Sequence, residues 1–175
     1  MQRYAEPHRA YHTLQHLEEC FALFDETSAA HAGEVLLALW FHDAIYDPKA
    51  DDNEAASARW GAEVLAAAGA EPEVVERFRG LVLTTRHDAQ PSSTDAALLA
   101  DIDLAILGAA PARFAEYEEQ VRREYAHVPG FLFRRERARI LQRFLARPAI
   151  YSTPYFRQRF ETQARANIER TLRGQ

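Results

Sequence analysis

The chain has 175 residues, of which 47% are hydrophobic and 27% charged, and its net charge at neutral pH is −5. This length and composition are ordinary for one globular domain with its own core. The longest apolar run, Val35 to Phe41, is far too short to cross a bilayer, and the first residues contain no apolar signal segment. A single cysteine excludes an internal disulfide, so we expect a cytoplasmic protein that does not bind membranes.

The charge is unevenly distributed along the chain. Residues 1–111 carry 7 basic and 19 acidic groups, whereas residues 112–175 carry 14 arginines and 7 acidic groups. Solvated helix faces with local ion pairs are the simpler interpretation of the basic part. The alternative is that some arginines face an anionic ligand, because the guanidinium fork matches phosphate. The chain as a whole is acidic, so we do not expect nucleic acid as its main partner.

Apolar residues recur at helical spacing and are separated by short turns, which predicts an all-α fold of about seven to eight helices. The second expected helix is nearly all apolar and must be buried. No repeat or linker interrupts the pattern, so a single domain is predicted. The expected helices cover about residues 11–24, 33–43, 51–69, 71–86, 95–108, 111–125 and 131–146, and the last one carries Phe156, Phe160, Ala164, Ile168 and Leu172.

Histidines and aspartates occur at three places in apolar or helical segments where a charged or metal-binding side chain is unusual. His12 and His16 are four residues apart and so share one helix face. The pair His42-Asp43 ends the most apolar helix, and Asp101 and Asp103 lie among leucine, isoleucine and alanine. A buried carboxylate is costly unless its charge is compensated. A divalent cation compensates such a charge, and imidazole with carboxylate is a suitable ligand set for metal-assisted hydrolysis.

Each of these signals also has a simpler explanation. The His-Asp dipeptide occurs twice, and the second copy, His87-Asp88, runs into Ala89-Gln90-Pro91, which is typical of a surface loop. His42-Asp43 is either a ligand pair or a hydrogen-bonded core pair, and Asp101 can be an early-helix carboxylate favoured by the helix dipole. A zinc-protease helix is excluded because Thr13 stands where its glutamate is needed. The sequence also contains neither a G-x-S-x-G elbow nor a phosphate-binding glycine loop.

Taken in order, His16, His42-Asp43 and Asp101 resemble the H…HD…D signature of the HD-domain superfamily. More specifically, the chain resembles a bacterial family of predicted HD-type metal-dependent phosphohydrolases. Further segments carry this resemblance: Glu6-Pro7-x-Arg9-x-Tyr11-His12, Tyr46-Asp47, Asp52-Asn53-Glu54, Thr84-x-x-His87, Asp101-x-Asp103-Leu104 and Glu161-x-x-Ala164-Arg165. The chain departs from some nucleotidase members, because Tyr46 stands at the glutamate of their HD-x-x-E motif.

The resemblance implies a single HD-type helical domain, with a metal-site core over about residues 9–110 and a basic part over 111–175. It implies one divalent metal ion, whether Mn, Mg, Fe, Co, Ni or Zn, bound by His16, His42, Asp43 and Asp101. His16 fits the first ligand better than His12 does. Asp101 fits better than Asp103, because the first aspartate of the D-x-D pair is usually the ligand.

The activity implied is hydrolysis of a phosphomonoester or phosphodiester, nucleotides included, by metal-activated water. The catalytic candidates are Glu54 or Asp47 as general base and His87 as phosphate ligand or proton donor. The substrate-binding candidates are His12, Arg86 and Asn53. For Glu54 and Asn53, helix-start hydrogen bonding is an equally good explanation.

Two other functions fit the same sequence. One is a non-catalytic helical module that binds a metal or nucleotide for regulation. The other is a polyanion-binding protein that uses the C-terminal arginines. The alanine-rich and aromatic helices leave both a single core and a homodimer open.

Overall fold

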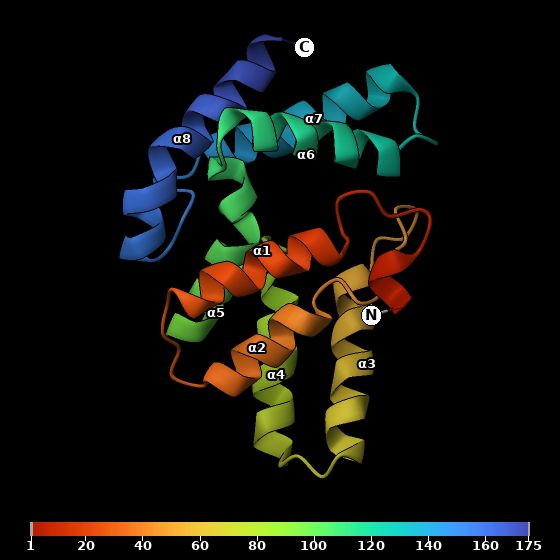
Figure 1. The fold of residues 1–175 in the computed structure, drawn as a ribbon, viewed down its shortest axis with the longest axis vertical. Helices are drawn as coiled ribbons and strands as arrows, with labels where there is room; N and C mark the ends of the chain where they lie inside the picture. Colours follow the sequence, from red (N-terminus) through yellow and green to blue (C-terminus); the bar gives the residue numbers. More distant parts are fainter. Residues whose placement is uncertain (1, 175) are drawn as a thin grey trace. The chain divides into compact units, whose positions relative to one another are not determined.

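The computed structural model describes residues 2–174, which form eight α-helices and two short 3-10 helices and contain no strand (Figure 1). The predicted all-α fold is confirmed. No helix in this range is long and apolar enough to span a bilayer. The elements are η1 (Gln2–Ala5), α1 (Leu14–Asp25), α2 (Ala32–Phe41), α3 (Asn53–Ala67), α4 (Pro72–Thr84), α5 (Thr94–Asp103), η2 (Leu104–Gly108), α6 (Pro111–Glu124), α7 (Gly130–Leu145) and α8 (Pro154–Arg173).

The helices begin and end close to the predicted positions for identifiable reasons. Three of them start with a proline in the first turn, where its missing N–H costs nothing and its φ is already helical. The Ser93 hydroxyl accepts a hydrogen bond from the N–H of Ala96 and so caps α5. One prediction differs: the helix expected over residues 95–108 is two elements, α5 and η2.

This break coincides with a boundary between two compact units, one ending at Asp103 and the other beginning at Leu104. The sequence predicted one domain, with its basic part beginning near residue 111. Residues 104–111 carry no charged side chain. The charge counts given for residues 1–111 and 112–175 therefore also hold for the two units. The first unit has 7 basic and 19 acidic groups, and the second has 14 basic and 7 acidic groups.

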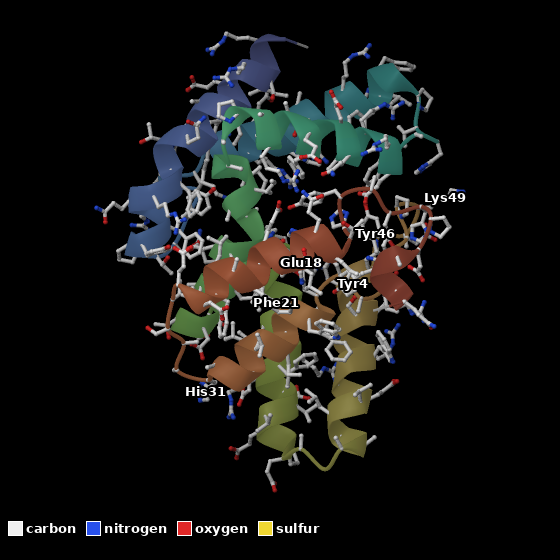
Figure 2. All side chains as sticks on the ribbon, in the orientation of Figure 1. Tyr4, Glu18, Phe21, His31, Tyr46 and Lys49 are labelled. Atoms are coloured by element: carbon white, nitrogen blue, oxygen red, sulfur yellow. The ribbon has the colours of Figure 1, made fainter. Side chains whose placement is uncertain are left out.

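In the first unit, α2 lies at the centre of the core, but it is not buried all round as its composition predicted, because Leu36 and Leu37 are 43% and 37% exposed. Val35, Ala38 and Leu39 are fully buried against α4, α5 and α1. Phe21 of α1, labelled in Figure 2, stacks on Trp40 of α2 with ring centroids 6.0 Å apart. α3 and α4 run side by side, joined by a short turn (Figure 1). Their approach requires Gly61, because a Cβ there would lie 2.4 Å from Cζ of Phe78.

The second unit is built on η2, whose backbone carbonyls are bound by side chains from later elements. The Asn167 amide donates to the carbonyls of Leu107 and Ala109, both at 2.9 Å. The Tyr151 hydroxyl donates to the Leu104 carbonyl at 3.1 Å. These bonds satisfy buried carbonyls that a short 3-10 helix leaves unpaired, and they hold α8 against η2.

Candidate metal centre

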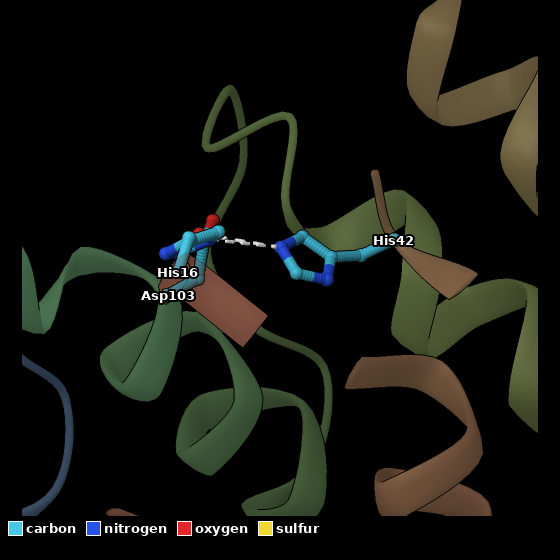
Figure 3. Close-up of side chains that lie close together, drawn as sticks. All are labelled: His16, His42 and Asp103. Carbon is cyan, nitrogen blue, oxygen red and sulfur yellow. Dashed lines mark hydrogen bonds and ion pairs between the residues drawn. The ribbon is translucent and has the colours of Figure 1, made fainter. Parts of the chain in front are cut away.

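Three side chains from distant parts of the sequence converge in the first unit: His16 of α1, His42 just after α2, and Asp103 at the end of α5. One ligand atom from each lies within 4.8 Å of the others. The two Nε2 atoms of the histidines are 3.2 Å apart. Oδ1 of Asp103 lies 3.3 Å from Nε2 of His16 and 3.6 Å from Nε2 of His42. Figure 3 shows the His42 ring pointing toward the side chains of His16 and Asp103.

Asp43 adds a fourth candidate ligand atom to this group. Its Oδ2 lies 2.9 Å from Nε2 of His42 and 3.6 Å from Nε2 of His16. This oxygen is buried, and no residue in the described range 2–174 donates to it while His42 is neutral, because the nearest nitrogen is Nε2 of His42 and the proton of that ring is on Nδ1. A buried acceptor without a donor is costly, and such atoms are rare in folded proteins. A cation bound between the four side chains would satisfy it.

The orientation of the His42 ring also suits a metal ligand. Its Nδ1 donates to the carbonyl of Leu39 at 2.7 Å, because a carbonyl can only accept. In the neutral ring this leaves the lone pair of Nε2 directed into the group. Nδ1 of His16 similarly lies 2.9 Å from the Tyr11 hydroxyl. Metal-binding histidines commonly use the second ring nitrogen in this way, which fixes the ring and its tautomer.

The four side chains form a strongly charged network. Burial alone would lower the pKa of His42, but the carboxylates of Asp43 and Asp103 outweigh it and raise that pKa well above its ordinary value. Burial alone would raise the pKa of both aspartates. The neighbouring imidazoles hold the pKa of each carboxyl well below its ordinary value instead. Both carboxylates are therefore charged, and either protons on the imidazoles or a cation must balance them.

His87 reaches the same group from the end of α4. Its Nε2 lies 2.7 Å from Oδ2 of Asp103, so the two oxygens of this carboxylate have different partners. The backbone of His87 has φ 54°, in the left-handed region that favours glycine. The neighbouring Asp88 is exposed and pairs with Arg86 at 3.4 Å, as expected of a surface loop. Of the second His-Asp dipeptide, His87 therefore contacts the metal group, whereas Asp88 lies at the surface.

Arg9 connects two of the segments that carry the ligands by binding their backbone carbonyls. Its fully buried side chain donates to the carbonyls of His12 at 3.0 Å, Asp43 at 2.8 Å and Ala44 at 3.2 Å. Glu6 compensates its charge, with Oε2 at 3.1 Å from Nε of Arg9. No role for Arg9 was predicted from the sequence. The signal available was its place in the segment around Glu6 and His12.

The predicted ligand set differs from this group at one position. Asp103 contributes the carboxylate, whereas Asp101 is buried elsewhere on the same helix. Two residues along an α-helix are about 200° apart around its axis, so these carboxylates face in nearly opposite directions. We therefore revise the candidate ligand from Asp101 to Asp103. The other three predicted ligands, His16, His42 and Asp43, do lie together.

His12 lies close to the group without belonging to it. Its ring stacks on Tyr46 with centroids 4.1 Å apart and meets the ring of His16 edge-on at 6.2 Å. Burial raises the pKa of the Asp43 carboxyl, and the charges of His42 and then of His12 lower it. This position agrees with the expectation that His16 and not His12 is the ligand.

The remaining predicted site residues lie outside the metal group. Asp47 and Asn53 bind each other across the loop before α3: the Asn53 amide accepts from the N–H of Asp47 and donates to its carbonyl, both at 2.9 Å. Oδ1 of Asp47 also accepts from the N–H of Lys49. Glu54 lies in the first turn of α3. The side chain of Arg86 is about half exposed, at 46%.

Comparisons of the chain with protein-family models, with curated proteins and with solved structures gave no match. The resemblance to HD-domain phosphohydrolases therefore depends on the residues quoted for it. The convergence of His16, His42, Asp43 and Asp103 is a separate observation that does not depend on that resemblance.

Proposed function

We propose that this protein is a metal-dependent phosphohydrolase of the HD type, in which His16, His42, Asp43 and Asp103 bind one divalent cation. The observation that carries the proposal is the convergence of ligand atoms from His16, His42, Asp43 and Asp103, in which the buried Oδ2 of Asp43 has no donor while His42 is neutral. Two imidazoles and two carboxylates are the donor set expected for a hard to borderline divalent ion. The alternative is a network balanced only by protons, in which a protonated His42 would donate from Nε2 to Oδ2 of Asp43 at 2.9 Å.

The site also contains groups suited to a phosphate ester. A bound cation polarises a phosphoryl oxygen and lowers the pKa of a coordinated water toward neutrality. Asp103 has one oxygen facing the two metal-site imidazoles and its other oxygen bound to His87, which holds the carboxylate in place. The imidazole of His12 lies beside the site and would bind a phosphate oxygen or protonate a leaving oxygen, whereas Nε2 of His87 is already bound to Asp103.

The proposal is tested in two steps on the purified full chain. Elemental analysis and titration of the stripped protein with Mn²⁺, Fe²⁺, Co²⁺, Ni²⁺ and Zn²⁺ should give one ion per chain. Hydrolysis of p-nitrophenyl phosphate, bis-p-nitrophenyl phosphate and a nucleotide panel should then depend on that ion and stop with a chelator. Absence of stoichiometric metal would overturn the proposal. Stoichiometric metal without turnover of any ester would instead favour the regulatory module.

A further inference from the structure

One face of α7 in the second unit combines exposed arginines with an exposed phenylalanine. Phe131, Arg135, Arg139 and Arg143 follow one another at four-residue intervals, so they form a continuous stripe about 6 Å apart along the helix. Arg134 flanks this stripe. The Phe131 side chain is 65% exposed, the most exposed of the large hydrophobic residues, and those of Arg135 and Arg139 are 70% and 64% exposed. We call these five residues the arginine face.

Acidic groups neutralise this face only partly. Glu136 is the carboxylate that pairs with it, at 2.9 Å from Arg139 and 3.4 Å from Arg135. Arg134 and Arg143 form no ion pair with any residue of the described chain. Burial, and then the charge of Arg143, lower the pKa of Arg147, so like charges approach each other at the end of α7. Like charges at this spacing destabilise a helix, and a ligand of opposite charge would relieve that repulsion.

The rest of the unit strengthens the positive field around the face. The second unit carries 14 arginines against 7 acidic groups. Every basic residue in it is arginine, whose planar guanidinium suits phosphate better than an ammonium does. Nucleic acid was not expected as the main partner because the whole chain is acidic. Since the charge boundary falls at the boundary between units, the net charge of the second unit is the relevant quantity.

The chemistry of the face favours one kind of polyanion. We propose that the arginine face of α7 binds single-stranded nucleic acid, with the arginines on successive phosphates and Phe131 stacked on a base. Single strands offer free base faces to aromatic side chains, whereas a duplex hides them within its own stack. An anionic membrane fits less well, because a helix lying on a bilayer inserts an apolar face. The apolar side of α7, which includes the fully buried Leu141, packs within the unit instead.

The test is fluorescence anisotropy of the full chain with labelled oligo-uridine and oligo-thymidine at several salt concentrations. We expect binding that weakens with salt. Replacing Arg134, Arg139 and Arg143 with glutamine should reduce the slope of log affinity against log salt by about 2, since each phosphate contact contributes about 0.7. Phe131→Ala should weaken binding by at least about fivefold while leaving that slope nearly unchanged.

A matched control removes the same charge elsewhere in the unit. It carries glutamine at three exposed arginines of α6 and α8, namely Arg123, Arg170 and Arg173. A loss equal to that of the first triple variant would mean that only bulk charge acts, and it would overturn the proposal. Equal or tighter binding to duplex DNA or to phosphatidylserine vesicles would overturn it as well. None of these measurements involves the metal, so their failure would leave the proposed hydrolase function untouched.

Discussion

Nε2 of His87 lies 2.7 Å from Oδ2 of Asp103, although reaching it places His87 in the left-handed region with φ 54°. A non-glycine residue in this conformation costs roughly 1–2 kcal/mol, and such strain persists where the surrounding contacts require it. Here the contact holds a charged carboxylate whose other oxygen faces His16 and His42. The strained backbone thus fixes the orientation of a candidate metal ligand.

Two substitutions separate the ring of His87 from its backbone. His87→Ala loses the imidazole and keeps the strain, whereas His87→Gly loses the imidazole and relieves the strain. Both should weaken metal binding about 10- to 100-fold, as is usual when a histidine or carboxylate supporting a ligand is removed. The glycine variant should be about 1 kcal/mol more stable than the alanine variant in urea unfolding. Unchanged metal affinity in both variants would show that the contact has no part in the site.

Asp103 and Asp101 provide a direct comparison within one helix. Asp103→Asn should abolish stoichiometric metal binding, because it removes the carboxylate that faces both imidazoles. Asp101→Asn should retain it. A cation that binds only the folded state should raise the melting temperature of the stripped wild type and of Asp101→Asn, but not that of Asp103→Asn. Calorimetry with and without cation measures this, and the reverse pattern would restore Asp101 as the ligand.

The positions of the helices were predicted for physical reasons, because apolar periodicity and proline determine helix ends locally. His16, His42 and Asp43 were predicted as ligands from the resemblance, and the structure brings them together. The choice between Asp101 and Asp103 could not be made in the same way. Both aspartates lie in apolar surroundings and fit the same motif, and only the rotation of α5 against α1 and α2 decides which one faces the histidines.

The role of Arg9 and the contact of His87 with Asp103 could not be predicted from the sequence for a similar reason, although His87 was a catalytic candidate. Two of the carbonyls that Arg9 binds are 34 and 35 residues away in the chain. Every residue has a backbone carbonyl, so no residue type in the sequence identifies these acceptors. His87 was expected in a loop that begins at the surface, which is correct for Asp88. The left-handed backbone at His87 turns its ring away from that loop and toward Asp103.

Arg9 should prove important for stability as well as for the site. Arg9→Lys keeps the charge near Glu6, but an ammonium cannot reach three carbonyls and a carboxylate together. We expect a loss of about 2–4 kcal/mol in the free energy of unfolding and a weaker affinity for metal, because the Asp43 backbone loses its anchor. Arg3→Lys, at a half-exposed arginine that also pairs with Glu6, is the control and should change neither quantity measurably. Equal stability of Arg9→Lys and wild type would contradict this role.

Asp95 gives the first unit a pH-dependent contribution to stability that is independent of the metal. Burial opposes its charge, but hydrogen bonds from the N–H groups of Ala30 and His31 and from the His31 ring lower its pKa below the ordinary value. A carboxyl whose pKa is lower when folded stabilises the protein above its unfolded pKa of about 3.9, and this stabilisation is lost as the pH falls through the folded value. Asp95→Asn should therefore be less stable than wild type at pH 7, with a difference that shrinks below about pH 4. Urea midpoints of both proteins at pH 7 and pH 3 measure this, and a difference that grew at the lower pH would contradict the assignment.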